Sequence, residues 1–392
     1  MIVLMIGLFN FFNLLFHFIS GRLLGNVLYG TFAAVMGVIY IFNIPSEIIQ
    51  TVVSRYTTKF ANEKRKVKSL LNRGLKRFFF LSLVILIIFA IISPLLGKFL
   101  FAEIPLILLT GILIIPIFII SVNRGILQGL KRFNSLGFSF FSEGIIKLGV
   151  GTFFILLGMK VYGALLGLIT GAFFALLVAS ISLKDIRKNK PENADIRGIY
   201  SYSLPVIISV ASVTIMYSID LILARRFFPD LAGQYAVISM LGKIIFFGTF
   251  PIVKTMFPFV SERDDKKEES RDLLKKSIFF VLILVLLVLI AYSLFPKQII
   301  SLLYGKEFLE FSSYLLLPSI TMGLLSFSNI FIYYNLSTHR KKRNYSLIFF
   351  AIAQIVLLSF FSFSISGFMY MNLLINLLLF IFLFLFNLKK IT

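Results

Sequence analysis

Two lysines inside long apolar segments are the residues best suited to bind an anion. Lys147 lies within residues 136–158, and Lys243 lies within residues 232–254. At a rise of ~1.5 Å per residue, each lysine is roughly 16 Å from one end of its segment, close to the middle of a bilayer. A charge at that depth costs about 2.5–3.5 kcal/mol to insert and usually faces a cavity. Such ammonium groups could replace the water around an anionic substrate.

Glu143 lies four residues before Lys147, so the two side chains share one helix face in the order that favours an ion pair. In a structural interpretation, Glu143 neutralises Lys147 and the pair holds helices together. In a functional interpretation, Lys147 and Lys243 line a cationic cavity, and Glu143 tunes the lysine or relays an ion. Lys243 has no acidic residue at helical spacing in its own segment, so it needs a partner or water from elsewhere.

Weaker candidates lie nearer the ends of the apolar segments. Asp220 precedes Arg225 by five residues, which favours an interfacial ion pair. Glu47 lies in the inner third of its segment and, with Asp220, is a candidate for ion coupling. Arg55 and Arg124 lie at segment ends, where they could extend a basic path inward or snorkel to the interface.

The composition determines what kind of element must position these charges. The 392 residues are 59% apolar and only 14% charged, and the mean hydropathy is +0.97. One soluble core could not bury so much apolar surface. The chain has no cysteine, which excludes a disulfide scaffold. The net charge of +22 comes from short basic clusters between apolar runs, so it favours membrane topology rather than nucleic-acid binding.

Run length predicts helices rather than barrel strands, because a spanning helix needs ~20 apolar residues and a barrel strand only ~10. The first run is not a cleavable signal peptide, because it lacks a basic leading segment and a small-residue cleavage site. Twelve spans are predicted, at residues 2–20, 31–53, 78–96, 104–122, 136–158, 161–183, 203–224, 232–254, 277–295, 312–334, 345–365 and 367–388.

The distribution of basic residues predicts the orientation. Of the 39 lysines and arginines, 30 lie in alternate loops and the C-terminal end. The positive-inside rule therefore places both termini in the cytoplasm of a cell-membrane protein. Clusters such as residues 64–66 and 340–343 are expected to contact anionic lipid headgroups.

The proline spacing indicates an internal repeat. Three proline pairs recur at offsets of 202 to 206 residues: Pro45 with Pro251, Pro94 with Pro296, and Pro116 with Pro318. The spacing predicts two six-helix halves, residues 1–190 and 191–392, that enter the membrane in the same direction. Transporters built from such parallel repeats bind substrate between the halves and alternate access by rocking them.

The sequence contains none of the common short motifs for nucleotide hydrolysis or metal binding. The chain contains no GxxxxGK[ST], HExxH, CxxC or DxD sequence, so no metal, cofactor or enzymatic activity is expected. His17 is interpreted as a satisfied histidine within the helix bundle rather than a proton relay.

Several short motifs resemble those of polysaccharide flippases. Residues 22–25 (Arg-Leu-Leu-Gly), followed by Tyr29-Gly30, resemble the turn after the first helix of these proteins. Residues 124–133 with Lys147-Leu148 resemble their loop after the fourth span and their fifth helix. Residues 203–235 are similar to the opening of their second half. The chain thus resembles the O-antigen type flippase branch of the multidrug/oligosaccharidyl-lipid/polysaccharide exporter superfamily.

This resemblance implies a MATE-like, all-α architecture that moves a polyprenyl-phosphate- or pyrophosphate-linked oligosaccharide to the outer leaflet, with glycan-assembly enzymes as further partners. The start of the chain close to the first span and the count of 12 rather than 14 spans are departures from many relatives. Lys243 is inferred from its depth alone. The residues expected to contact substrate are Lys147, Lys243, Arg22, Arg124, Arg55, Glu143 and Gln128.

Two other functions remain open. A cation-coupled drug exporter of the same superfamily would use acidic cavity residues, and only Glu143 and Glu47 could serve in that role. A polysaccharide polymerase would need a large outer loop, and the longest one, roughly residues 296–311, is short.

Overall fold

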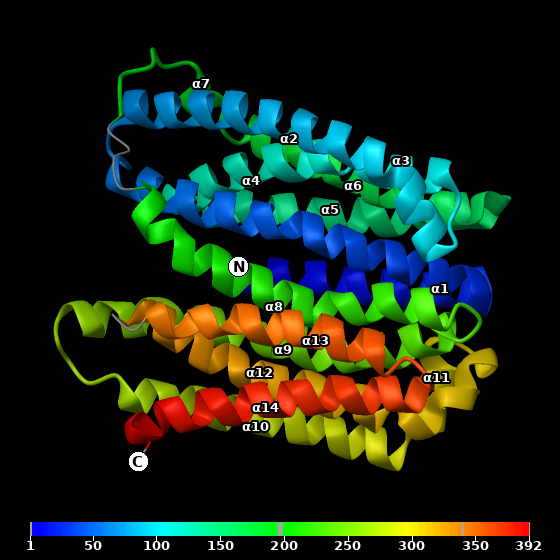
Figure 1. Ribbon diagram of the computed structural model, residues 1–392. Helices are drawn as coiled ribbons and strands as arrows, with labels where there is room; N and C mark the ends of the chain where they lie inside the picture. The colour runs from blue at the N-terminus through cyan, green and yellow to red at the C-terminus, as the bar shows by residue number, and fades with distance from the viewer. Residues whose placement is uncertain (1, 195–198, 339–340, 392) are drawn as a thin grey trace. The chain divides into compact units, whose positions relative to one another are not determined.

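A computed structural model describes residues 2–194, 199–338 and 341–391, and the regular elements in these ranges are helices (Figure 1). This confirms the predicted all-α membrane fold. In chain order the elements are α1 (Ile2–Lys59), α2 (Lys64–Leu100), α3 (Ile104–Gly111), α4 (Ile114–Gly129), α5 (Phe133–Phe154), η1 (Ile155–Met159), α6 (Lys160–Ile181), α7 (Lys184–Arg187), α8 (Ile199–Phe227), α9 (Ala232–Asp265), α10 (Arg271–Leu294), α11 (Pro296–Leu303), η2 (Lys306–Tyr314), α12 (Leu316–Ser337), η3 (Lys341–Ser346), α13 (Leu347–Phe360) and α14 (Ile365–Ile391).

Among the described residues, 9 helices are long and apolar enough to cross a membrane. Two of them are interrupted by glycines with positive φ, Gly25 at 72° and Gly158 at 85°. Glycine adopts this conformation without a Cβ clash, which allows the chain to break the helix there. The two parts of each interrupted helix correspond to two predicted spans. The nine helices therefore account for all but one of the predicted spans, residues 345–365, where α13 has only 14 residues.

The described chain divides into two compact units, Met1–Ser203 and Leu204–Thr392. In the first unit, α5 packs along α6, and α1 packs against α4 and α5. The backbones of α5 and α6 are in direct contact, because a Cβ built on Gly167 would lie 2.5 Å from the Cα of Gly151. Small residues allow this close approach between membrane helices.

In the second unit, α9 packs against α10 and α12, and α14 packs against α12 and α13. A Cβ on Gly242 of α9 would meet the carbonyl oxygen of Pro318 at 2.8 Å, so α9 and α12 are also in close contact. In the most apolar stretch of each helix, 67% is buried inside the protein for α8, α9 and α12, but only 22% for α10. Thus α8, α9 and α12 provide the interior of this unit, and α10 provides apolar surface.

Candidate functional site

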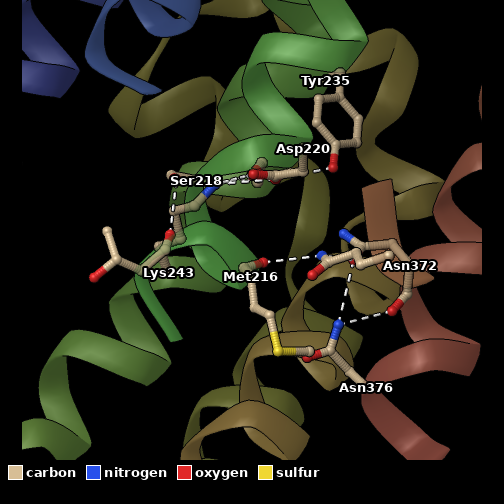
Figure 2. A network of polar contacts seen from close by, with 10 residues as sticks. Met216, Ser218, Asp220, Tyr235, Lys243, Asn372 and Asn376 are labelled. Atoms are coloured by element: carbon tan, nitrogen blue, oxygen red, sulfur yellow. Dashed lines mark hydrogen bonds and ion pairs between the residues drawn. The ribbon is translucent and has the colours of Figure 1, made fainter. Parts of the chain in front are cut away.

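A buried ion pair joins α8 to α9 in the second unit. The ammonium of Lys243 lies 3.1 and 3.0 Å from the two carboxylate oxygens of Asp220, and each side chain is only 1% exposed (Figure 2). Tyr235 and Ser239 donate hydrogen bonds to the same Asp220 oxygen, at 3.0 and 2.5 Å. Lys243 also donates to the hydroxyl of Ser239 at 2.5 Å. Both charges are therefore neutralised and hydrogen-bonded, as buried charges require.

This geometry corrects one prediction and completes another. The expected interfacial pair of Asp220 with Arg225 is wrong, because Asp220 is buried and bonded to Lys243. Arg225 instead donates to the carbonyl of Pro229 at 2.9 Å. The partner that Lys243 needed comes from the preceding helix, 23 residues earlier. Sequence analysis missed Ser239, although its position four residues before Lys243 places both on one face of α9.

Side-chain amides extend this network to α13 and α14. Gln354 donates to the carbonyl of Met216 at 3.0 Å and to the amide oxygen of Asn372 at 2.8 Å (Figure 2). Asn376 donates to the same amide oxygen at 3.3 Å. Asn372 also forms a hydrogen bond with Tyr235. A continuous buried polar network thus links four helices, and isolated amides in apolar segments gave no sequence signal for it.

A second ion pair, between a buried arginine and a half-buried glutamate, joins α4 to α5 in the first unit. A guanidinium nitrogen of Arg124 lies 2.6 Å from a carboxylate oxygen of Glu143. Arg124 also donates to the hydroxyl and the carbonyl of Ser139, at 3.2 and 3.1 Å, and its guanidinium carbon lies 3.8 Å from the ring centroid of Phe140. In the structural interpretation Glu143 would pair with Lys147, but the ion pair that its carboxylate forms is with Arg124 on the neighbouring helix.

Lys147 is consequently the buried cation of the first unit that lacks an anionic contact. Its side chain is 6% exposed, and its ammonium lies 5.7 and 5.4 Å from the ring centroids of Phe9 and Phe16. In the part of the chain that the structure describes, its ammonium forms no hydrogen bond or ion pair. Cation–π contacts with two phenylalanines stabilise the charge without neutralising it.

The other predicted residues lie on α1 and α4. Gln128 accepts a hydrogen bond from Gln50 at 2.9 Å, which ties α4 to α1. Arg22 and Arg55 are exposed on α1, and Glu47 is half-buried there. The structure thus groups Arg124, Glu143 and Lys147 on α4 and α5, and Asp220 with Lys243 on α8 and α9. Within the described ranges, no group of three or more His, Asp or Glu side chains is placed to hold a metal ion.

The chain was compared with known proteins. The model of the family described as "Polysaccharide biosynthesis protein" matches residues 1–264. An uncharacterized membrane protein of Methanocaldococcus jannaschii is 23% identical over 287 residues, which cover 68% of this chain and 67% of that protein.

Two solved structures share the fold at low sequence identity. An inward-facing multidrug resistance MATE family transporter of the MOP superfamily superposes with a TM-score of 0.77 at 15% identity, covering 97% of this chain and 94% of that one. A MOP superfamily transporter from Pyrococcus furiosus superposes with a TM-score of 0.72 at 16% identity, covering 100% of this chain and 93% of that one.

These findings agree with the apolar helices and the resemblance of the motifs. Both solved structures are described as transporters. The chain belongs to the polysaccharide biosynthesis protein family and is a multi-pass membrane protein with a MATE-like fold.

Proposed function

We propose that this transporter flips a polyprenyl-phosphate- or pyrophosphate-linked oligosaccharide from the cytoplasmic to the outer leaflet of the cell membrane, by alternating access. The observation that carries the proposal is Lys147, a buried ammonium without an anionic partner among the described residues. The match to a polysaccharide biosynthesis family supports a saccharide-bearing substrate.

The physical problem of flipping is desolvation of the headgroup. A sugar with one or two phosphates would lose water across ~30 Å of hydrocarbon without replacement. A lysine ammonium can replace part of that hydration through charge-assisted hydrogen bonds of ~2.7–2.9 Å. The phosphate would in turn supply the counter-charge that Lys147 lacks, so binding would benefit both groups.

The remaining charges have different roles in this proposal. Arg124 already forms an ion pair with Glu143, and Lys243 already forms one with Asp220. We therefore assign the first phosphate contact to Lys147, and we assign to the two ion pairs the role of holding neighbouring helices. Asp220 could couple an ion only if Lys243 moved away from it. We assign both termini to the cytoplasm because the basic loops lie on that side by the positive-inside rule. There the loops would contact anionic lipids, and glycan-assembly enzymes would have access.

The test is transport of a fluorescently labelled polyprenyl-pyrophosphate disaccharide in proteoliposomes. Lys147→Met should reduce the rate at least about tenfold, the factor corresponding to ~1.4 kcal/mol. Lys147→Arg should retain most of the rate because it keeps the charge. Lys160→Met, which removes an exposed lysine at the start of α6, is the matched control. Transport by Lys147→Met at the rate of the unmodified protein would refute the phosphate contact.

The second candidate is a cation-coupled multidrug exporter, which the fold shared with a multidrug resistance transporter favours. The Pyrococcus furiosus transporter carries the description that "reverse polarity" of its binding pocket suggests a different function. In the present chain the unpaired buried charge is basic, which favours an anionic substrate. Ion-dependent movement of a cationic dye, without movement of the lipid-linked disaccharide, would support the exporter instead.

A further inference from the structure

One carboxylate in the first unit lies within reach of two buried cations. Glu143 precedes Lys147 by four residues on α5, in the order that favours an ion pair within one helix. Arg124 approaches the same carboxylate from α4 and lies 2.6 Å from it. Arg124 and Lys147 are each only 6% exposed. Which of the two cations holds the carboxylate therefore decides which of them keeps an uncompensated charge.

Contacts with two further helices fix the guanidinium of Arg124 beside Glu143. Besides the ion pair, it donates to the hydroxyl of Ser139 at 3.2 Å, and that hydroxyl donates to the carbonyl of Ala175 on α6 at 3.2 Å. Its guanidinium carbon also lies 3.8 Å from the ring centroid of Phe140. Charge-assisted hydrogen bonds such as the one to Glu143 are about twice as strong as neutral ones. Arg124 cannot turn away from Glu143 without breaking this set of contacts.

Aromatic rings direct the ammonium of Lys147 toward a different helix. It lies 5.7 and 5.4 Å from the ring centroids of Phe9 and Phe16 on α1. Phe9 in turn contacts Phe140, the ring that Arg124 also contacts, with 5.3 Å between the two ring centroids. Cation–π contacts stabilise an ammonium without supplying a negative charge. The carboxylate is thus held on the side of α4, and the ammonium is held on the side of α1.

Release of the carboxylate would close the anion site. A carboxylate on the same helix as Lys147 is an intramolecular ligand, so it competes with a substrate at a high effective concentration. An ion pair of Glu143 with Lys147 would neutralise the ammonium, and an incoming phosphate would then have to displace the carboxylate. The observed arrangement avoids this competition, because Glu143 is already occupied by Arg124.

We propose that Arg124 is a positioning residue for the anion site: it holds the carboxylate of Glu143 and so keeps Lys147 available to the phosphate of the lipid-linked substrate. The assignment rests on the proposed function, and it goes beyond the role of this ion pair in holding α4 to α5. Arg124 acts through Glu143 and needs no contact with the substrate. A purely structural ion pair would be equally sensitive to the loss of either partner, whereas a positioning residue makes the two losses opposite in effect.

Binding of polyprenyl pyrophosphate to the detergent-solubilised full-length protein tests the assignment. Arg124→Gln releases Glu143 to pair with Lys147 and should weaken binding at least about tenfold, which corresponds to ~1.4 kcal/mol. Glu143→Gln breaks the same ion pair but removes the competing carboxylate, so it should tighten binding. The variant that carries both substitutions should recover the affinity that Arg124→Gln loses. Arg124→Lys keeps a cation for Glu143 and should retain most of the affinity.

A second measurement needs no ligand. In the unmodified protein, Lys147→Met removes a buried charge that has no anionic partner among the described residues, and it should raise the unfolding temperature in detergent. In the Arg124→Gln protein, the same substitution removes the new partner of Glu143 and should lower the unfolding temperature. Lys160→Met, at an exposed lysine of α6, is the matched control and should give the same shift in both proteins.

The outcomes separate this assignment from the proposed function. Undiminished binding by Arg124→Gln, or an equal loss in Arg124→Gln and Glu143→Gln without recovery in the double variant, would show that Arg124 only holds the helices together. A shift of the same sign for Lys147→Met in both proteins would also overturn the assignment. In these cases weaker binding by Lys147→Met still supports the proposed function. If Lys147→Met binds the lipid as tightly as the unmodified protein, the phosphate contact fails, and the role of Arg124 fails with it.

Discussion

At the scale of single residues, the decisive property of this protein is how its buried charges are matched. Arg124 with Glu143 and Lys243 with Asp220 form ion pairs, each between neighbouring helices of one unit. Removing one partner of such a pair leaves an uncompensated buried charge, at a cost of about 3–5 kcal/mol. Lys147 is the exception, and this contrast separates a charge suited to binding substrate from charges that hold the fold.

The pair of Asp220 and Lys243 predicts a characteristic pattern in a double-mutant cycle. Asp220→Asn and Lys243→Met should each destabilise the protein by about 3–5 kcal/mol. The double variant should recover much of that loss, because no charge is left unpaired. Thermal unfolding in detergent measures all four proteins. Additive losses in the double variant would show that the two side chains act independently.

At the scale of the elements, close helix packing depends on glycine at particular positions. Gly163, Gly167 and Gly171 form a ridge of small residues along α6 that faces α5 and η1. A Cβ at Gly163 would lie 2.7 Å from the backbone nitrogen of Ile155, and one at Gly171 would lie 2.9 Å from the carbonyl oxygen of Glu143. The partner surface on α5 and η1 is main chain, which cannot move aside as a flexible side chain would.

Two glycine substitutions should therefore change stability in opposite directions. Gly167→Ala would place a methyl group 2.5 Å from the Cα of Gly151 and should destabilise the protein by about 1–3 kcal/mol through overpacking. Gly149→Ala meets nothing within 4 Å and should stabilise α5 by up to about 1 kcal/mol, because alanine favours helix. The unfolding temperature of each variant, compared with that of the unmodified protein, tests both predictions. A stabilised Gly167→Ala would contradict direct contact of the two backbones.

The short helix α7 is attached to the start of α5 and α2 by charge. Arg132 donates to both carboxylate oxygens of Asp185, at 2.6 and 2.5 Å, and Lys64 lies 3.7 Å from the same carboxylate. The hydrogen bond from Arg132 lowers the pKa of Asp185 to about 2. Because the pKa of Asp185 is lowered in the folded protein, the attachment is complete at pH values above the ordinary pKa of aspartate. It is lost as the pH falls toward the lowered pKa.

Acid should therefore release α7. Hydrogen exchange at residues 184–194 should accelerate as the pH falls from about 4 to about 2, beyond the intrinsic pH effect on exchange. In Asp185→Asn, exchange should be fast already at neutral pH, and the additional acid step should disappear. Glu268→Gln, which changes an exposed carboxylate elsewhere, is the control. An acid step that persists in Asp185→Asn would assign it to another group.

At the scale of the whole molecule, the distribution of basic loops predicts which side of the membrane each loop occupies. The chain has no cysteine, so a single introduced cysteine can be labelled without background. Lys188→Cys should react with a membrane-impermeant maleimide only in inverted vesicles, and Lys306→Cys only in intact cells, because the first belongs to a basic loop and the second to an opposite one. The reverse pattern would invert the proposed orientation and the direction of flipping.

Hydropathy and run length along the sequence predict an all-α membrane protein and the course of its helices. Each of the twelve predicted spans contains a helix, because hydropathy and run length are local properties that the chain carries along its length. Glycines with positive φ separate the first span from the second and the fifth from the sixth. The sequence also identified Lys147 and Lys243 as charges within the spans, and both are buried, whereas the burial of Arg124 was not predicted from its place at a segment end.

Which of these charges neutralise one another depends on how the helices pack. Lys243 pairs with Asp220 across 23 residues, and Glu143 pairs with Arg124 across 19 residues rather than with Lys147 on its own helix. Helical spacing describes neighbours within one helix, whereas ion pairs and ring contacts between helices depend on how the helices pack. That packing leaves Lys147 as a buried cation without an anion among the described residues, the feature on which the proposed function rests.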